Sequence, residues 1–224
     1  MASPAPPSVR RRRASLLFRV LLALATVLVL RFVFVYALRY LSWDPTVFGE
    51  AFWSRRYGLG LHLIGGVVAI LTGLIQLWLG ETRRAMAWHR VLGLTYVMAV
   101  TIGVAGGCYL AVTAGSEGWV YASGLVGLST AWAITTAMAY VAIRRRLIDL
   151  HRDWMIRSYV VTMAFVFFRL FDELGARAGL ADPGERAKAA AWLCWAVPLL
   201  LAEPVLQWRR FRRPILRSAP DSGA

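Results

Sequence analysis

The sequence predicts an all-α fold, a polytopic membrane helix bundle with about six transmembrane helices. Hydrophobic residues make up 58% of the 224-residue chain, and its mean hydropathy of +0.55 is far above that of a soluble domain. The apolar residues gather in six runs, each near the roughly 20 residues that cross a bilayer as a helix. Every backbone polar group inside lipid needs an internal partner, so runs of this length predict helices.

The first apolar run covers residues 16–38 and follows a block of arginines. This run is longer than the roughly 7 to 15 residues of a signal-peptide core, and no small-x-small cleavage pattern follows it. We therefore expect an uncleaved first transmembrane helix. Residues 1–15 are expected to form a disordered basic N-terminal tail, residues 16–208 the transmembrane domain, and residues 209–224 a basic C-terminal tail.

Five further apolar runs follow the first. They cover residues 59–79, 90–112, 119–143, 155–171 and 189–208. The longest loops between the runs, residues 39–58 and 172–188, are too short to bury a core of their own. The sequence therefore predicts no soluble domain.

Lysine and arginine residues are divided unequally between the two sides of such a bundle. With the N-terminus inside, seventeen of them flank the inner ends of the helices and six flank the outer ends. The positive-inside rule then places both termini of this multi-pass protein in the cytoplasm. The net charge of +14 lies in these short blocks instead of along one face, so the predicted partner is the lipid bilayer and not nucleic acid.

The histidines suggest a cofactor. On this topology His89 and His151 lie on the cytoplasmic side, one on each of two helices that run in the same direction. Bis-imidazole ligation of haem iron needs such a pair at one depth in a bundle. One hypothesis is therefore a b-type haem held by His89 and His151, with Arg90, Arg152 or Arg157 pairing with the haem propionates.

The haem hypothesis requires a particular start for each of the two helices. Side chains lean toward the N-terminus of a helix, so both helices must begin early, near Thr82 and Leu147, for the imidazoles to point into the bundle. Gly93 would then open a slot beside His89. The alternative is that the histidines lie at the membrane interface and bond to backbone, acidic or headgroup oxygens. Three histidines on two sides cannot form a catalytic zinc site, and no catalytic residue set is predicted.

Buried charges form a second group of candidates. Arg31 and Arg169 are expected at one level within the membrane, near His62, and Glu203 near the inner face is expected to meet Arg157 or His151. The acidic residues within reach of Arg31 and Arg169 are Glu50, Asp172 and Glu173. Such groups either contact a proton or an anion, or form ion pairs that lock the bundle, and the sequence leaves both alternatives open.

Four segments carry a family resemblance: HLIGGVVAILTGLIQLW from His62, HRVLGLTYV from His89, TAWAITTAMAYVAIRRR from Thr130 and HRDWMIRSYVVTMAFVFFRL from His151. Together, over about residues 60–172, they resemble a bacterial family of predicted membrane proteins, domain-of-unknown-function family 2306. The resemblance implies a polytopic inner-membrane protein.

A weaker similarity is to cytochrome b561-like haem membrane proteins, and it implies that His89 and His151 form one ligand pair for haem b. His62 has no histidine partner on its own side, so the sequence does not support a second haem or an electron path through two haems across the membrane.

Two functions of different classes follow. The first is a binding, transport or assembly protein whose arginines and histidines recognise an anionic group, and it predicts a polar cavity reached by Arg31, His62 and Arg169. The second is a membrane oxidoreductase that passes electrons through haem between a quinone and a redox partner. It requires the His89 and His151 imidazoles to lie within one haem's width of each other.

Overall fold

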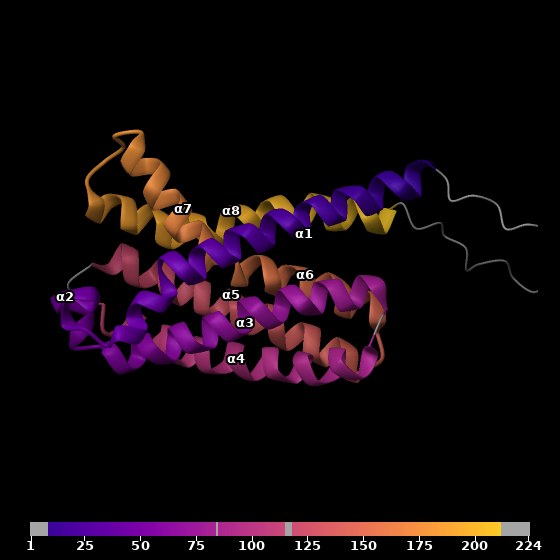
Figure 1. Cartoon of the computed structure of the whole chain (residues 1–224), viewed down its shortest axis with the longest axis horizontal. Helices are drawn as coiled ribbons and strands as arrows, with labels where there is room; N and C mark the ends of the chain where they lie inside the picture. The colour runs from indigo at the N-terminus through magenta and orange to yellow at the C-terminus, as the bar shows by residue number, and fades with distance from the viewer. Residues whose placement is uncertain (1–8, 84, 115–117, 212–224) are drawn as a thin grey trace, which may run out of the picture.

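The computed structural model describes residues 9–83, 85–114 and 118–211, and all regular structure in these residues is helical (Figure 1). The elements in chain order are α1 (Val9–Val35), the 3-10 helix η1 (Ala37–Ser42), α2 (Pro45–Trp53), α3 (Arg56–Thr82), α4 (Met86–Val112), α5 (Trp119–Arg144), α6 (Ile148–Thr162), α7 (Ala164–Arg177) and α8 (Pro183–Phe211). The predicted all-α class is confirmed. Most of the two predicted tails, residues 1–8 and 212–224, lies outside the described residues.

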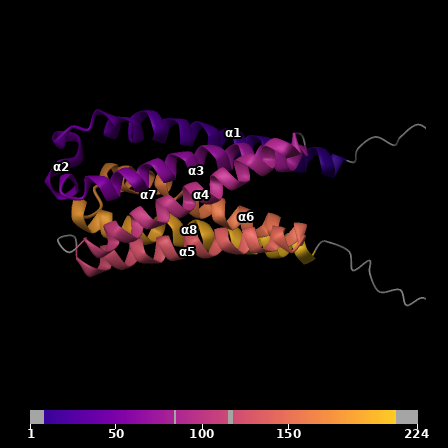
Figure 2. The ribbon, with the colours of Figure 1, turned by 90° about the horizontal axis from the view of Figure 1, so that it is seen from below.

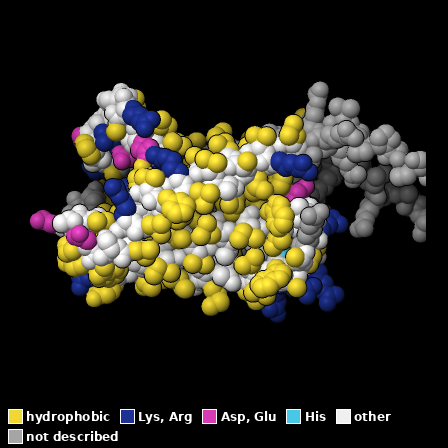
Figure 3. Space-filling model, viewed as in Figure 1, with side chains coloured by type: hydrophobic (Ala, Val, Ile, Leu, Met, Phe, Trp, Pro, Cys, Tyr) yellow, Lys and Arg dark blue, Asp and Glu magenta, His cyan; other side chains and the backbone are white. Residues whose placement is uncertain are grey.

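Five of the described helices are long and apolar enough to cross a membrane by themselves: α1 continued by η1, then α3, α4, α5 and α8. A sixth crossing is counted when α6 and α7, which are bent by 41° where they meet, are taken together as one span. Counted this way, the helices give the predicted six-span bundle. Hydrophobic side chains cover most of the middle of its surface, as contact with lipid requires (Figure 3).

The bundle has two distinct ends. α1 begins and α8 ends at one of them, here called the terminal end, together with the α3–α4 and α5–α6 turns (Figures 1 and 2). At the opposite end, here called the far end, lie α2 and the α7–α8 turn. The halves of the bundle nearest these ends are called the terminal half and the far half. The assignment of the terminal end to the cytoplasm stays a prediction.

The fifth predicted span, residues 155–171, is broken at Met163. The Thr162 hydroxyl bonds back to the Ser158 carbonyl at 2.8 Å, and such a back-bond often bends a helix. The N–H groups of Val166 and Phe167 then both donate to the Met163 carbonyl, which starts α7 in a new direction. Neither proline nor glycine marks this break, so the sequence pattern gave no sign of it.

The helices α3 and α4 touch through their backbones. A Cβ added to Gly106 of α4 would lie 2.6 Å from the His62 backbone nitrogen of α3. One turn or so away, a Cβ on Gly65 would meet the backbone of Gly103. Gly65, Gly103 and Gly106 therefore serve close packing of these two helices.

Candidate functional site

In the terminal half, Arg157 and Arg152 form ion pairs with acidic residues of other helices. Arg157 donates twice to the Glu203 carboxylate, from Nε at 2.5 Å and from Nη2 at 2.8 Å. Its side chain is 8% exposed, lies over the Trp154 ring, and has a buried Nη1 without a partner among the described residues. Arg152 pairs with Glu81 at 3.1 Å at the surface. The predicted meeting of Glu203 with Arg157 is confirmed.

Arg90, the remaining arginine proposed for the haem propionates, is exposed on the first turns of α4. Of the three arginines proposed to pair with the haem propionates, two therefore already have carboxylate partners and the third lies at the surface.

His89 lies in the first turn of α4 and His151 in the first turn of α6, and both turns are at the terminal end. The His151 Nδ1 lies 2.9 Å from the Ala139 carbonyl, so this nitrogen donates and the Nε2 atom is left free. The His89 Nδ1 is buried and has no hydrogen-bond partner within the described parts of the chain. The predicted slot beside Gly93 holds the Gln76 amide, which donates to the His89 carbonyl at 2.6 Å.

The helices that carry these histidines begin earlier than the apolar runs. α4 begins at Met86 and α6 at Ile148, so His89 and His151 both lie inside a helix. The expected start near Leu147 agrees with the structure, while α4 begins a turn later than the expected Thr82.

A chain of buried hydroxyl groups crosses the middle of the bundle. Ser158 of α6 is within 2.7 Å of both the Tyr96 hydroxyl of α4 and the Thr136 hydroxyl of α5. Thr162 accepts from the Trp132 indole at 2.9 Å and lies 2.8 Å from the Tyr96 hydroxyl. The sequence analysis missed this cluster, although Ser158 and Thr162 stand one turn apart in an apolar run and so share a helix face.

The direction of these hydrogen bonds follows from Thr162. Its single hydrogen goes to the Ser158 carbonyl, so the Tyr96 hydroxyl must donate to Thr162 and accept from Ser158. Ser158 in turn accepts from Thr136. The chain therefore ends on a backbone carbonyl with each donor satisfied, as expected for a cluster that joins α4, α5 and α6.

The far half contains a cavity of about 140 Å³ between α1, α3, α4, α5, α7 and α8. Three basic side chains reach its wall, those of Arg55, His62 and Arg169. The rest of the wall is aromatic or aliphatic: Phe32, Tyr40, Phe52, Leu59, Leu63, Leu110, Tyr121, Leu125, Leu128, Ala164, Phe165, Phe168 and Cys194. The break at Met163 brings the first turns of α7 to this wall.

Arg169 differs from the arginines of the terminal half. Its guanidinium lies over the rings of Tyr36 at 5.3 Å and Phe168 at 5.8 Å, and no described residue gives it an acidic partner or a hydrogen-bond acceptor. Ring faces attract a guanidinium but leave its N–H donors unsatisfied. Arg169 therefore brings free hydrogen-bond donors to a mainly apolar cavity.

The other two basic residues of the cavity are held by backbone carbonyls. The His62 Nδ1 donates to the Gly103 carbonyl at 2.8 Å, and the imidazole lies against the Phe165 ring with centroids 4.8 Å apart. Arg55 donates from Nη1 to the Thr113 carbonyl at 3.1 Å. The sequence analysis counted Arg55 as a loop arginine and so missed it, because only the fold turns this side chain back toward the bundle.

Arg31 does not line the cavity, which corrects one part of the predicted polar cavity. It lies beside the cavity and donates to both Glu173 carboxylate oxygens, at 2.7 and 2.8 Å. Glu173 was one of the three acidic residues expected within its reach. Only His62 and Arg169 of the predicted trio reach the cavity wall.

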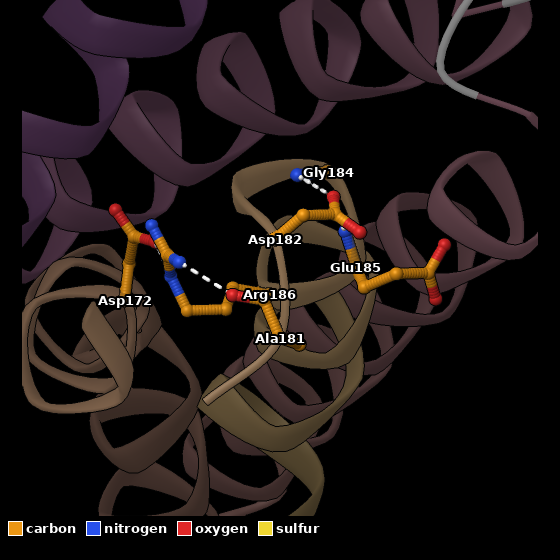
Figure 4. Close-up of polar contacts among 6 residues, drawn as sticks. All are labelled: Asp172, Ala181, Asp182, Gly184, Glu185 and Arg186. Carbon is orange, nitrogen blue, oxygen red and sulfur yellow. Dashed lines mark hydrogen bonds and ion pairs between the residues drawn. The ribbon is translucent and has the colours of Figure 1, made fainter. Parts of the chain in front are cut away.

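Polar contacts in the α7–α8 turn hold the C-terminal part of α7 in place (Figure 4). Arg186 of α8 donates to Asp172 of α7 at 3.1 Å and to the Ala181 carbonyl at 2.9 Å. The Asp182 carboxylate caps α8 by accepting from the N–H groups of Gly184 and Glu185. These backbone hydrogen bonds favour the charged carboxylate and lower the pKa of Asp182 below its ordinary value.

A comparison with known families gives one match. The sequence profile of a family described as "Predicted membrane protein (DUF2306)" matches residues 59–206, which is more than half of the chain. The matched segment includes His62 and Arg169, but it begins after α1, η1, α2 and Arg55. No curated protein and no solved structure matches the chain.

Proposed function

The chain belongs to the DUF2306 family of predicted membrane proteins, and we propose that it is a membrane binding protein whose far-half cavity holds a small organic anion. The observation that carries this proposal is the position of Arg169, which lines the cavity and whose donors have no acceptor among the described residues. Binding at this cavity would be the step shared by a transport role and an assembly role.

The size of the cavity limits the ligand. A dry engineered cavity of roughly 150 Å³ in another protein accepts one benzene ring. The cavity here, about 140 Å³, therefore suits a single ring or a short head group. Its aromatic and leucine-rich wall favours an apolar body with one polar group, as in most small-molecule sites.

The charge of the cavity selects the polar group. A guanidinium presents planar N–H donors that match a carboxylate or a phosphate, and it stays charged at every physiological pH. An arginine within a membrane costs about 2.5 to 3.5 kcal/mol on insertion scales unless it finds a partner. A bound anion would supply that partner to Arg169, and Arg55 would add positive charge at the same wall.

A binding measurement on two arginine variants tests this proposal. We would place the protein in lipid nanodiscs, add 4-fluorobenzoate and follow its binding by ¹⁹F NMR. Arg169→Gln should weaken binding at least about tenfold, since one lost charged hydrogen bond is worth about 1.5 to 3 kcal/mol. Arg152→Gln is the matched control, because Arg152 pairs with Glu81 at the terminal end, and it should bind like the wild type. Equal binding by all three proteins would overturn the proposal.

A second candidate function, haem binding, is motivated by the positions of His89 and His151 in the first turns of α4 and α6 and by the buried Nδ1 of His89, which has no partner among the described residues. The residues fit a haem only in part, because Gln76 occupies the space beside Gly93. If bound, the haem would supply one-electron chemistry, with His151 oriented by its bond to Ala139. Oxidised and dithionite-reduced spectra test this candidate. A Soret band lost in His89→Ala and His151→Ala would support it, and a colourless protein from haem-replete cells would exclude it.

A further inference from the structure

The wall of the cavity toward lipid is formed in part by α1, which is attached to the rest of the bundle by few polar contacts. In its most apolar window 22% of the residues are buried, half the fraction of α3. Phe32 of α1 covers the cavity and lies against Phe165 of α7, with ring centroids 6.1 Å apart. α1 also precedes residues 59–206, which the family profile matches.

One ion pair joins α1 to α7 at this wall, and we call it the α1 latch. Arg31 holds the Glu173 carboxylate through Nη2, and the two side chains are 43% and 25% exposed. The Tyr36 ring lies beside the latch, with Arg31 5.6 Å and Arg169 5.3 Å from its centre. The same aromatic ring therefore contacts the latch and the anion-binding arginine.

From this geometry we infer that the ligand is a membrane-borne amphiphile with one anionic group and an apolar chain, and that it enters from the bilayer between α1 and α7. This inference rests on the proposed function of the cavity. The cavity has room for a head group but not for a long chain. A chain attached to a head group at Arg169 must leave it, and the seam beside Phe32 and Phe165 offers an apolar path to lipid.

Separation of α1 from α7 would open this path. It requires the latch to break, and the anionic group of an entering ligand can meet Arg31 in place of Glu173 while the latch is open. Movement of α1 would uncover Phe165 and Arg169, while the family bundle from α3 to α8 stays closed around its own core. The ligand would then be drawn from lipid and not from water.

A cross-link across the latch tests the route. In a Cys108→Ala background, Arg31→Cys and Glu173→Cys are introduced together, and the protein in nanodiscs is treated either with a short bis-maleimide or with N-ethylmaleimide. The two substitutions remove the ion pair in both samples, and only the bis-maleimide ties α1 to α7. Cys194 is buried and is left in place. The probe is photoreactive oleate added in lipid vesicles, and its rate of labelling is read by mass spectrometry.

Three results support the inference together. The tied protein should be labelled by oleate at least tenfold more slowly than the protein treated with N-ethylmaleimide. Wild-type protein should bind oleate at least tenfold more tightly than 4-fluorobenzoate. Arg31→Gln alone, which needs no chemical treatment, should release oleate several-fold faster than the wild type because its latch is lost.

The failures are distinguishable from one another. Equal labelling of the tied and untied proteins would overturn the route through α1. Binding of 4-fluorobenzoate without binding of oleate would overturn the amphiphile class and leave the proposed anion cavity in place. Binding of neither probe by the wild-type protein would overturn the proposed function itself, and with it this inference.

Discussion

Two arginines, Arg157 in the terminal half and Arg169 in the far half, have opposite surroundings. In the terminal half, Arg157 is buried and its charge is met by Glu203 of another helix. In the far half, Arg169 reaches a cavity, and the described residues offer it only aromatic rings. The residue type is the same in both places. The difference lies in whether a neighbouring helix brings a carboxylate to the same depth.

This contrast separates stability from function. A paired arginine joins two helices, and its removal should be felt throughout the fold. An arginine without a partner contributes little to the fold and is available to a ligand. The two halves therefore predict different outcomes for substitutions of similar chemistry, and the following variants test this from the largest expected effect to the smallest.

The largest effect is expected for Glu203→Ala. It removes the carboxylate that is hydrogen-bonded to the buried Arg157 and leaves only the more weakly interacting Asp153 nearby, which should lower the free energy of unfolding by about 3 kcal/mol. Unfolding in detergent, followed by tryptophan fluorescence, measures this change. Glu81→Ala is the control, since its pair with Arg152 is exposed on both sides and should contribute under about 1 kcal/mol.

A double variant makes the same comparison sharper. Arg157→Met with Glu203→Met removes both charges, so it should recover most of the stability that Glu203→Ala loses. Similar small losses for Glu203→Ala and Glu81→Ala would show that the buried pair does not set the terminal half apart.

In the far half, the backbone contact that places His62 should matter next. Gly106→Ala puts a Cβ 2.6 Å from the His62 nitrogen, so α3 and α4 must separate, at a cost of about 2 kcal/mol. The shift should also weaken binding of 4-fluorobenzoate. Gly60→Ala on α3 is the control, because its Cβ would meet only the Trp43 ring at 3.6 Å and helix propensity favours alanine. Equal effects of the two variants would argue against a tight α3–α4 seam.

The sequence predicted the spans well and the site in part. Hydropathy and length find helices such as α3 and α4, because the bilayer requires both. Hydropathy and length do not predict helix breaks or short helices. Met163 lies in an unbroken apolar run, and α2 lies in a segment expected to be a loop. Pairing across helices, as between Arg157 and Glu203, was within reach because depth can be counted along a helix. The rotation of a helix cannot be counted in this way, so Arg31 was placed in the cavity although it faces Glu173.

Loss of one hydrogen bond from the hydroxyl chain in the middle of the bundle should lower the free energy of unfolding by less. Thr162→Val removes the acceptor of the Trp132 indole, while Tyr96 can turn its hydrogen toward Ser158. Hydrogen bonds between membrane helices average near 0.6 kcal/mol and reach about 1.7, so we expect a loss of about 1 kcal/mol. Thr101→Val is the matched control, because the Thr101 hydroxyl is exposed and bonds only within its own helix. A loss as large as that of Glu203→Ala would mean that hydroxyl groups, not charges, hold the terminal half.

The smallest effect is expected at the far end, where polar contacts lie in water. Asp182→Ala removes the cap of α8 and should lower Tm at neutral pH by less than Thr162→Val does. The folded state lowers the pKa of Asp182 below 3.8, so its stabilisation is present above that pH and is lost as the pH falls through the folded value. The Tm difference between wild type and Asp182→Ala should therefore shrink below pH 3.8. Asp182→Asn keeps a side-chain acceptor without the charge, so its own difference from Asp182→Ala should not change with pH. A difference between wild type and Asp182→Ala that stays constant in acid would show that the cap depends on the side-chain acceptor and not on the charge of Asp182.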